Sequence, residues 1–304
     1  MTRLGIDIGG TKVALRVEQE SGNGAESTFI WSKDETAQQD LALLGEQVEV
    51  LLARWPHELT SVGVAMPAIC DPDGFVRTWP GRPGWVGVDL TEELRKMFPA
   101  VPVGHADDGD LGAVAEARAA GCPDVLYLGV GTGVGGGVVV DDRPWPGPAH
   151  GSCEVGHLVV DRAGPRCDCG RRGCLQASAS GPATLRRAAA LRGRDVTFTD
   201  LVAGMRARDD WAVAALRETA DALAAAVVGI NELAHPALAL LGGGFAAGIP
   251  DLVPLVTGSV ERLVRPGVDV PPVRRAALGS LSSLRGALLL ADMVAEERTG
   301  DPIS

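Results

Sequence analysis

RLGIDIGGTKVALRV, residues 3–17, is the stretch of sequence that decides the fold. A mostly apolar run that contains Asp7 covers residues 3–8, a glycine turn follows at residues 9–11, and a second apolar run covers residues 13–17. Two such runs joined by a short glycine turn are typical of a β-hairpin. Because glycine has no side chain, the turn's peptide N–H groups can also approach an anion closely. On its own, the pattern fits an ordinary hairpin and a phosphate-binding loop equally well.

A second stretch of the same design, VLYLGVGTGVGGGVVV, occupies residues 125–140. We predict a strand over 125–130, a glycine turn over 131–137 and a return strand over 138–140. No Gly-Lys-Ser/Thr follows, which excludes a Walker loop, and a strand rather than a helix follows, which excludes a dinucleotide fingerprint. Five glycines in seven residues cost backbone entropy, so a plain hairpin explains them poorly. One such hairpin in each half of the chain predicts two related lobes.

The remaining chain alternates apolar runs of strand and helix period, which indicates an α/β protein. We predict strands over 61–66, 101–103 and 237–241, helices over 41–52, 216–230 and 284–297, and an ordered loop over 68–88. An acidic turn, Asp107-Asp108-Gly109-Asp110, follows the second of these strands, and Asp110 is expected to cap the next helix. Three carboxylates this close repel one another, so at least one is expected to be paired, metal-bound or engaged with substrate.

Length and charge limit the function classes. At about 150 residues per domain, 304 residues predict two domains. The 39 acidic residues outnumber the 28 basic ones, so no basic face is expected to follow a nucleic acid. Asp7 and Lys12 interrupt the first apolar stretch, which argues against a signal peptide, and no apolar run approaches the ~20 residues of a membrane span. We therefore expect a cytoplasmic protein.

Three closely spaced cysteines and one histidine upstream of them predict a metal site. The residues are His157, Cys167, Cys169 and Cys174. Three thiolates and one imidazole form a closed tetrahedral set, which is typical of a structural zinc ion and leaves no position for a reacting water. The other three cysteines are assigned no role: Cys70, Cys122 and Cys153.

Together these features resemble the ROK family (repressors, open reading frames and sugar kinases) of the actin-like ATPase/hexokinase superfamily, over nearly the whole chain. The resemblance implies an α/β, two-lobed actin-like ATPase/hexokinase (ribonuclease H-like) fold with a cleft between the lobes and a structural zinc knot. It implies a smaller lobe of residues 1–108, joined by the last helix at 284–304, and a larger lobe of residues 109–283. Family members are often dimers, so we expect a homodimer. The motifs that carry the resemblance are Asp7-Ile8-Gly9-Gly10-Thr11-Lys12, the Trp79–Trp85 loop, the Asp108 turn, the Gly131 hairpin, Glu154-Val155-Gly156-His157, the cysteine knot and Gly242-Gly243-Gly244.

The resemblance also implies residue roles. Asp108 matches the general base that accepts the proton of the sugar 6-hydroxyl as this oxygen attacks the γ-phosphate of Mg-ATP. Mg-ATP would be bound by Asp7, Gly9, Gly10, Thr11, Lys12, Gly131, Thr132, Gly133, Gly135, Gly242, Gly243 and Gly244. The sugar would be bound by Pro67, Ala68, Gly81, Asp107, Glu154, His157 and Gln176, with His157 binding zinc through its other nitrogen.

The family includes repressors that carry a winged helix-turn-helix before the first phosphate loop. The early position of Asp7 leaves no space for one, so the kinase branch is expected. A sugar-sensing protein without catalysis and a zinc-dependent hydrolase are the readings from other classes. Intact Asp108 and glycine loops argue against the first, and the closed zinc set argues against the second.

Departures from the glucose-specific pattern bear on the substrate. Asp107 stands where these members usually have Asn, and Gln176 stands where they have Glu; Ala68, Gly81 and Asp110 also differ. In the family the Asn faces the sugar's 3- and 4-hydroxyls, and a carboxylate there suits an ammonium group. We therefore expect 3-amino-3-deoxyglucose (kanosamine) as substrate, in an antibiotic pathway. A plain glucokinase with neutral drift at residue 107 and a C7-cyclitol kinase stay open as alternatives.

Overall fold

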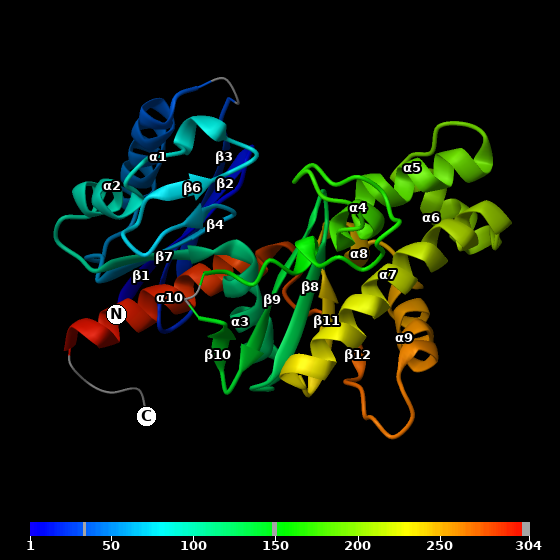
Figure 1. The fold of residues 1–304 in the computed structure, drawn as a ribbon. Coiled ribbons are helices and arrows are strands. Elements are labelled where there is room, and N and C mark those ends of the chain that lie inside the picture. Colours follow the sequence, from blue (N-terminus) through cyan, green and yellow to red (C-terminus); the bar gives the residue numbers. More distant parts are fainter. Residues whose placement is uncertain (33–34, 148–150, 300–304) are drawn as a thin grey trace. The chain divides into compact units, whose positions relative to one another are not determined.

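The computed structural model describes residues 1–32, 35–147 and 151–299, and the chain divides into two compact units. Unit 1 comprises the described residues of Met1–Ala115, Pro146–Ser152 and Leu281–Ser304. Unit 2 comprises Glu116–Trp145 and Cys153–Ser280. Each unit contains a five-stranded sheet with helices packed against it (Figure 1).

The sheet of unit 1 has the strand order β3-β2-β1-β4-β7. An antiparallel meander is formed by β1 (Thr2–Ile8), β2 (Lys12–Gln19) and β3 (Gly24–Ile30). β4 (Ser61–Met66) runs parallel to β1, and β7 (Val103–Asp107) runs parallel to β4. The first hairpin predicted from the sequence is therefore the pair β1–β2.

One face of this sheet packs against α1 (Ala37–Leu52). Leu44 and Val48 of the helix are buried in one apolar cluster with Ile6 of β1. The helix begins with a capping box, in which the Thr36 side chain accepts from the Gln39 backbone N–H and the Gln39 side chain accepts in return. Sequence period and cap thus fix the same helix.

The other face of the sheet carries three glycines, one on each of β1, β4 and β7: Gly5, Gly63 and Gly104. They are opposite one another in the strand register. α10 (Ser282–Thr299) lies so close that a Cβ on Gly63 would come within 1.9 Å of the Ala287 carbonyl oxygen. Glycine is required where a helix backbone approaches a strand this closely. The last helix therefore packs as part of unit 1.

The sheet of unit 2 has the strand order β10-β9-β8-β11-β12. Its strands are β8 (Val125–Val130), β9 (Val134–Val140), β10 (Arg143–Trp145), β11 (Leu238–Gly242) and β12 (Val273–Arg275). The first three form an antiparallel meander, and β11 and β12 run parallel to β8. In both units, a meander therefore continues into two parallel strands, which confirms the repeated design predicted from the two glycine hairpins.

Helices complete unit 2. The long α7 (Asp210–Ala234) buries Leu216, Leu223 and Val227 in the core, and α9 (Leu252–Leu263) packs beside it. Its other helices are α4 (Leu175–Ala179), α5 (Gly181–Arg192), α6 (Phe198–Ala207) and α8 (Gly244–Ala247), with a short 3₁₀ turn at Val155–His157.

The remaining elements of unit 1 are α2 (Leu90–Met97), strands β5 (Ile69–Cys70) and β6 (Val76–Thr78) and a 3₁₀ turn at Pro83–Trp85. The chain passes between the units within α3 (Asp108–Ala120) and within the 3₁₀ turn Gly279–Leu281.

Several sequence predictions of element bounds differ from the structure. The strand predicted at 101–103 lies at Val103–Asp107, so the acidic stretch is no separate turn: Asp107 ends β7 and Asp108 begins α3. The glycine turn predicted at 131–137 covers only 131–133, because β9 begins at Val134 and its glycines pair through backbone atoms alone. The last helix is longer than predicted, and residues 300–304 lie outside the described residues.

Candidate active site

Predicted site residues gather at one edge of the unit 1 sheet. Because β1, β4 and β7 are parallel, their carboxyl ends meet at the same edge. Asp7 lies near the end of β1, Pro67 follows β4, and Asp107 and Asp108 stand at the junction of β7 and α3. Met66 and Asp107 are register partners, which brings the last two strand ends level. This edge is where open α/β sheets bind their ligands.

Asp7 is the electrostatically unusual residue of this edge. Burial, followed by the nearby Asp108 carboxylate, raises the pKa of Asp7 from 3.8 to about 7, and Lys12 opposes the rise. A buried carboxylate beside a second carboxylate is costly to ionise unless a cation is close. Carboxylate oxygens are ligands that Mg²⁺ prefers. Asp7, beside the Asp108 carboxylate, therefore fits the magnesium ion of a Mg-nucleotide.

Asp7→Asn is expected to stabilise the nucleotide-free protein, in a buffer without added magnesium, in a pH-dependent way. The raised pKa of Asp7 in the folded state means that the wild type loses stability as pH rises from 3.8 to about 7. Asn cannot ionise, so the variant keeps that stability. Its gain in unfolding free energy is expected to grow by about 1.4 kcal/mol per unit between pH 5 and pH 7, then level off.

Urea unfolding at pH 5, 6, 7 and 8 measures this gain. Asp73→Asn, at an exposed acid of the same unit, controls for the removal of one negative charge. A gain of equal size at all four pH values would contradict the assignment of a raised pKa to Asp7.

Asp107, and not Asp110 as the sequence analysis expects, caps helix α3. Its Oδ1 atom accepts hydrogen bonds from the backbone N–H groups of Gly109, at 2.9 Å, and Asp110, at 3.1 Å. The prediction for Asp110 is wrong because the helix begins at Asp108, which places Asp110 inside the first turn. An Asn at residue 107 would make the same two bonds through its own Oδ1. The cap therefore does not require the negative charge.

The first glycine turn is stabilised by hydrogen bonds to its carbonyl groups. The hairpin closes through a bond from the Gly9 N–H to the Lys12 carbonyl, at 2.9 Å. A Cβ on Gly10 would meet no atom within 4 Å, so one side of the turn is open. Buried Trp31 and Arg82 donate to its carbonyl groups from the other side. Neither residue is among the site residues predicted from the sequence. An arginine between the tryptophans of residues 79–85 is the sequence feature that could have indicated Arg82.

Two predicted sugar-binding positions in this unit differ in surroundings. Ala68 is buried in the apolar core of unit 1. A Cβ on Gly81 would lie 3.8 Å from the Cα of Gly10, an ordinary contact distance. The structure thus brings Gly81 next to the phosphate turn, and space does not dictate glycine there.

In unit 2, the second glycine turn, predicted to bind phosphate, and the predicted adenosine loop lie at the same edge of the sheet. β8 and β11 are parallel neighbours, with Gly131 after the first and Gly243 after the second. Gly243 has a φ of +82°, and a Cβ on it would lie 2.5 Å from the Val130 carbonyl oxygen. Only glycine fits at this position. Of the other predicted residues, Thr132 and Gly133 lie in the turn, Gly135 is in β9, Gly242 ends β11 and Gly244 begins α8.

The predicted zinc ligands lie together in unit 2. The ligand atoms of His157, Cys167, Cys169 and Cys174 are all within 4.8 Å of one another. The Cys167 sulfur is 3.8 Å from the His157 Nδ1, and the Cys169 and Cys174 sulfurs are 3.6 Å apart. Tetrahedral zinc with ordinary bond lengths places such atoms about 3.6–3.8 Å apart. The donor set therefore fits a structural zinc ion.

The thiols of this cluster differ in pKa. Burial, together with the neighbouring thiols, raises the pKa of Cys174 to about 12. A bond from the backbone N–H of Arg171, followed by its side chain, lowers the pKa of Cys169 to about 6. Three thiolates require a positive charge among them, since thiolates repel one another.

Gln176 connects this cluster to the glycine turn. Its Nε2 donates to the Cys167 sulfur at 3.4 Å, and its Oε1 would lie 3.2 Å from a Cβ on Gly133. The 3₁₀ turn Val155–His157 packs on β9, because a Cβ on Gly156 would lie 1.9 Å from the Val134 carbonyl oxygen. Exposed Glu154 precedes this turn and half-buried His157 ends it. Through its Nδ1, His157 faces the sulfurs, so its Nε2 lies on the other side of the ring.

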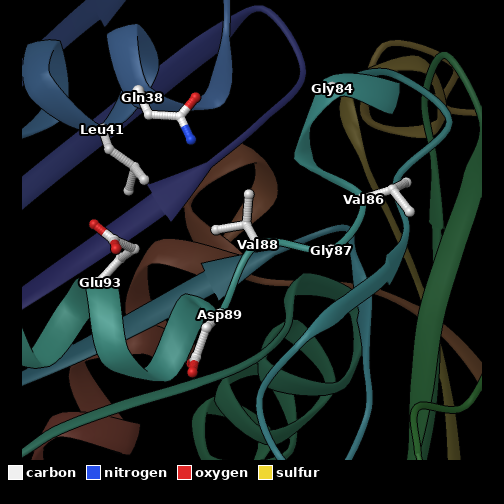
Figure 2. A pocket seen from close by; sticks show the side chains of 8 residues that line it. All are labelled: Gln38, Leu41, Gly84, Val86, Gly87, Val88, Asp89 and Glu93. Atoms are coloured by element: carbon white, nitrogen blue, oxygen red, sulfur yellow. The ribbon is translucent and has the colours of Figure 1, made fainter.

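A pocket of about 340 Å³ in unit 1 lies apart from these residues. Gln38 and Leu41 of α1 line one side, and Val88, Asp89 and Glu93 line the other (Figure 2). Both acids already have partners, since Asp89 accepts from the Glu92 backbone and Glu93 pairs with Lys96. We therefore do not include this pocket in the candidate site.

Over the described residues, none of the helices combines the length and apolar character needed to cross a membrane.

Comparisons with known proteins identify the family of the chain. The model of the ROK family matches residues 3–294. The kanosamine kinase of Amycolatopsis mediterranei is 56% identical over 292 residues, which cover 96% of each chain. The glucokinase of Thermotoga maritima is 30% identical, covering 80% of this chain and 82% of that protein.

Solved structures share the fold. The ROK hexokinase of Thermus thermophilus superposes with a TM-score of 0.85 at 30% identity, covering 98% of this chain and 100% of that one. The ROK glucokinase of Streptomyces griseus, in complex with glucose and AMPPNP, superposes with a TM-score of 0.79 at 27% identity, covering 96% and 100%. Because the family model, the kanosamine kinase and the solved structures all match nearly the full length of the chain, the chain belongs to the ROK family.

Proposed function

We propose that the protein is an ATP-dependent sugar kinase that transfers the γ-phosphoryl group of ATP to the 6-hydroxyl of kanosamine. The observation that carries the proposal is the 56% identity with a kanosamine kinase over 96% of both chains, against 30% identity with a glucokinase. The protein is proposed to act as a homodimer, which light scattering measures.

Asp108 is the proposed general base. It stands at the carboxyl end of β7, at the start of α3. Its carboxylate accepts the proton of the sugar O6–H as O6 forms a bond to the γ-phosphorus, and the bond from that phosphorus to the bridging oxygen breaks to release ADP. Asp7 would hold the magnesium ion of Mg-ATP. The ion would neutralise charge on the phosphates, and the peptide N–H groups of the unit 1 glycine turn would position them.

The zinc ion is proposed to act on substrate binding through His157 and not on the chemistry. Four protein ligands close the tetrahedral set, so no site for a reacting water is left. His157 held through Nδ1 presents Nε2 for a sugar hydroxyl, in a fixed ring orientation. Glu154, which is exposed and lies three residues before His157, is the second residue of this unit that we propose to bind the sugar. Gln176 contacts the Cys167 sulfur of the zinc knot and lies beside Gly133 of the glycine turn.

Asp107 is the proposed specificity determinant. Its cap bonds to Gly109 and Asp110 could equally be made by Asn, so the cap does not account for a carboxylate. A carboxylate at the sugar's 3-position favours an ammonium group, to which it offers a charge-assisted hydrogen bond. With a 3-hydroxyl, the same carboxylate accepts a hydrogen bond but cannot donate one.

Measuring kcat/KM with kanosamine, glucose, glucosamine and a C7-cyclitol tests the proposal. Kanosamine is expected to have the highest value. Preference for glucose or for the cyclitol would replace the proposed substrate with that compound. Failure of every sugar to release ADP would overturn the kinase and favour a sugar sensor.

Asp107→Asn is expected to shift the preference, expressed as the ratio of kcat/KM values, toward glucose by a factor of about 10 or more. Asn keeps the cap of α3 and removes the charge, so the change isolates the charge. Asp107→Ala is the matched variant, because it loses cap and charge together and is expected to lower stability by about 1 kcal/mol as well. An unchanged ratio in Asp107→Asn would mean that the charge does not select the amine.

A further inference from the structure

The carbonyl groups of the unit 1 glycine turn accept hydrogen bonds from two buried side chains. Trp31 donates through Nε1 to the Gly9 carbonyl at 3.1 Å, and Arg82 donates through Nε to the Gly10 carbonyl at 3.2 Å. In a planar trans peptide, the carbonyl and the following N–H point in opposite directions. These two bonds therefore direct the N–H groups of Gly10 and Thr11 away from Trp31 and Arg82.

The orientation of Arg82 is itself fixed. One terminal nitrogen pairs with Asp40 Oδ2, and the other donates to the Ser32 carbonyl at 2.7 Å. The guanidinium lies 4.2 Å over the ring of Trp31. Asp40 is held in turn by Trp85, whose Nε1 donates to the same carboxylate oxygen at 2.7 Å. Because the donors of a guanidinium form a rigid fork, bonds at both terminal nitrogens aim Nε at Gly10.

The burial of this pair is unusual for a purely structural element. Arg82 is 3% exposed and Asp40 is 1% exposed, and among the described residues the buried Asp40 Oδ1 has no hydrogen-bond partner. A buried ion pair contributes little more to stability than apolar residues of the same volume, because both charges lose their hydration. Apolar residues could not, however, donate to the Gly10 carbonyl. The contacts that only the arginine supplies are those to the Gly10 carbonyl and to the Ser32 carbonyl, and the first of them lies in the turn.

We propose that Arg82, held by Asp40, is a positioning residue that orients the Gly10–Thr11 peptide for binding the phosphates of Mg-ATP. This rests on the proposed kinase function, because it takes residues 9–11 as a phosphate loop. Arg82 does not touch the nucleotide. It acts through the carbonyl of Gly10, and its loss therefore weakens nucleotide binding more than it slows the chemical step.

Three variants test the proposal. The double variant Asp40→Leu/Arg82→Met replaces the ion pair with apolar side chains and leaves no unpaired buried charge. Arg82→Lys keeps a positive charge for Asp40 but cannot span three acceptors from one ammonium. The matched control is Arg3→Met, which removes an arginine of the same unit that pairs with Glu18 and Asp292.

The readouts are the Kd of Mg-ATP by calorimetry without sugar, urea unfolding, and kcat and KM for ATP at saturating sugar. We expect the double variant and Arg82→Lys to bind Mg-ATP about 10-fold more weakly, with KM for ATP raised accordingly and kcat at saturating ATP nearly unchanged. Arg3→Met is expected to lower stability without changing the Kd.

A wild-type Kd in both Arg82 variants would overturn the proposal, as would a Kd in Arg3→Met that rises as much as theirs. A different result would contradict the proposed function, namely a wild type that binds Mg-ATP but does not phosphorylate kanosamine. In that case the calorimetric comparison still decides the role of Arg82.

Discussion

Asp108→Asn is expected to lower kcat for kanosamine phosphorylation by about 10³-fold. The amide has the size of the carboxylate and stands at the same first residue of α3, but it cannot accept the proton of the 6-hydroxyl. Substrate binding does not depend on that proton transfer, so KM for the sugar is expected to change much less than kcat. A coupled assay for ADP release measures both constants.

Asp110→Asn is the control for this variant. Asp110 lies in the same first helical turn, two residues further on, so the exchange removes a like charge at nearly the same place. It is expected to change kcat far less than Asp108→Asn does. Equal losses in the two variants would mean that the helix start needs negative charge in general, and retention of most of kcat in Asp108→Asn would remove Asp108 as base.

Cys174→Ser is expected to lower the unfolding free energy by at least ~3 kcal/mol and Tm by roughly 10 °C, because it opens the metal site. Cys174 is fully buried and its sulfur is 3.6 Å from that of Cys169, so the knot cannot rearrange around a missing ligand. Elemental analysis is expected to find one zinc ion per wild-type chain and none, or a fraction, in the variant.

Cys122→Ser is the matched control, since Cys122 lies outside the metal cluster and donates to the Asp124 carbonyl, which a hydroxyl can also do. Chelation of the wild type supplies a second readout. Activity is expected to fall in proportion to folded protein as zinc is removed. Loss of activity with an intact fold would revive the zinc hydrolase, and a wild type purified without zinc and equally stable would overturn the zinc knot.

Much of the candidate site could be predicted from the sequence because its motifs are local. The turn at residues 9–11 lies between two strands that pair directly, and four metal ligands fall within eighteen residues. Backbone hydrogen bonds between neighbouring segments and short ligand spacings leave few alternative arrangements. The bounds of the second glycine turn could not be predicted in this way, because glycines can belong to a turn or to a strand, and the pairing of Gly135 with Gly129 decides between them.

The ion pair of Asp40 and Arg82 could not be predicted from local sequence patterns. Asp40 interrupts an apolar stripe that continues through Leu44 and Val48, and this is a signal that a charge is buried on the core side of α1. Its partner is 42 residues away in a segment without regular period. No spacing rule connects the two, so the sequence indicates a buried acid and cannot name what it binds.

By itself, the sequence determined the repeated hairpin design, the α/β class, the zinc ligands and the family, because each depends on residue types at short, fixed spacings. Tertiary structure alone decided which acid caps α3, which side chains hold the first glycine turn, and which glycines of the sheet the last helix contacts. The glycines at residues 5, 63 and 104 become a single groove for α10 only when three strands adopt one register. Strand register and long-range packing depend on the whole sheet, so a short sequence motif does not determine them.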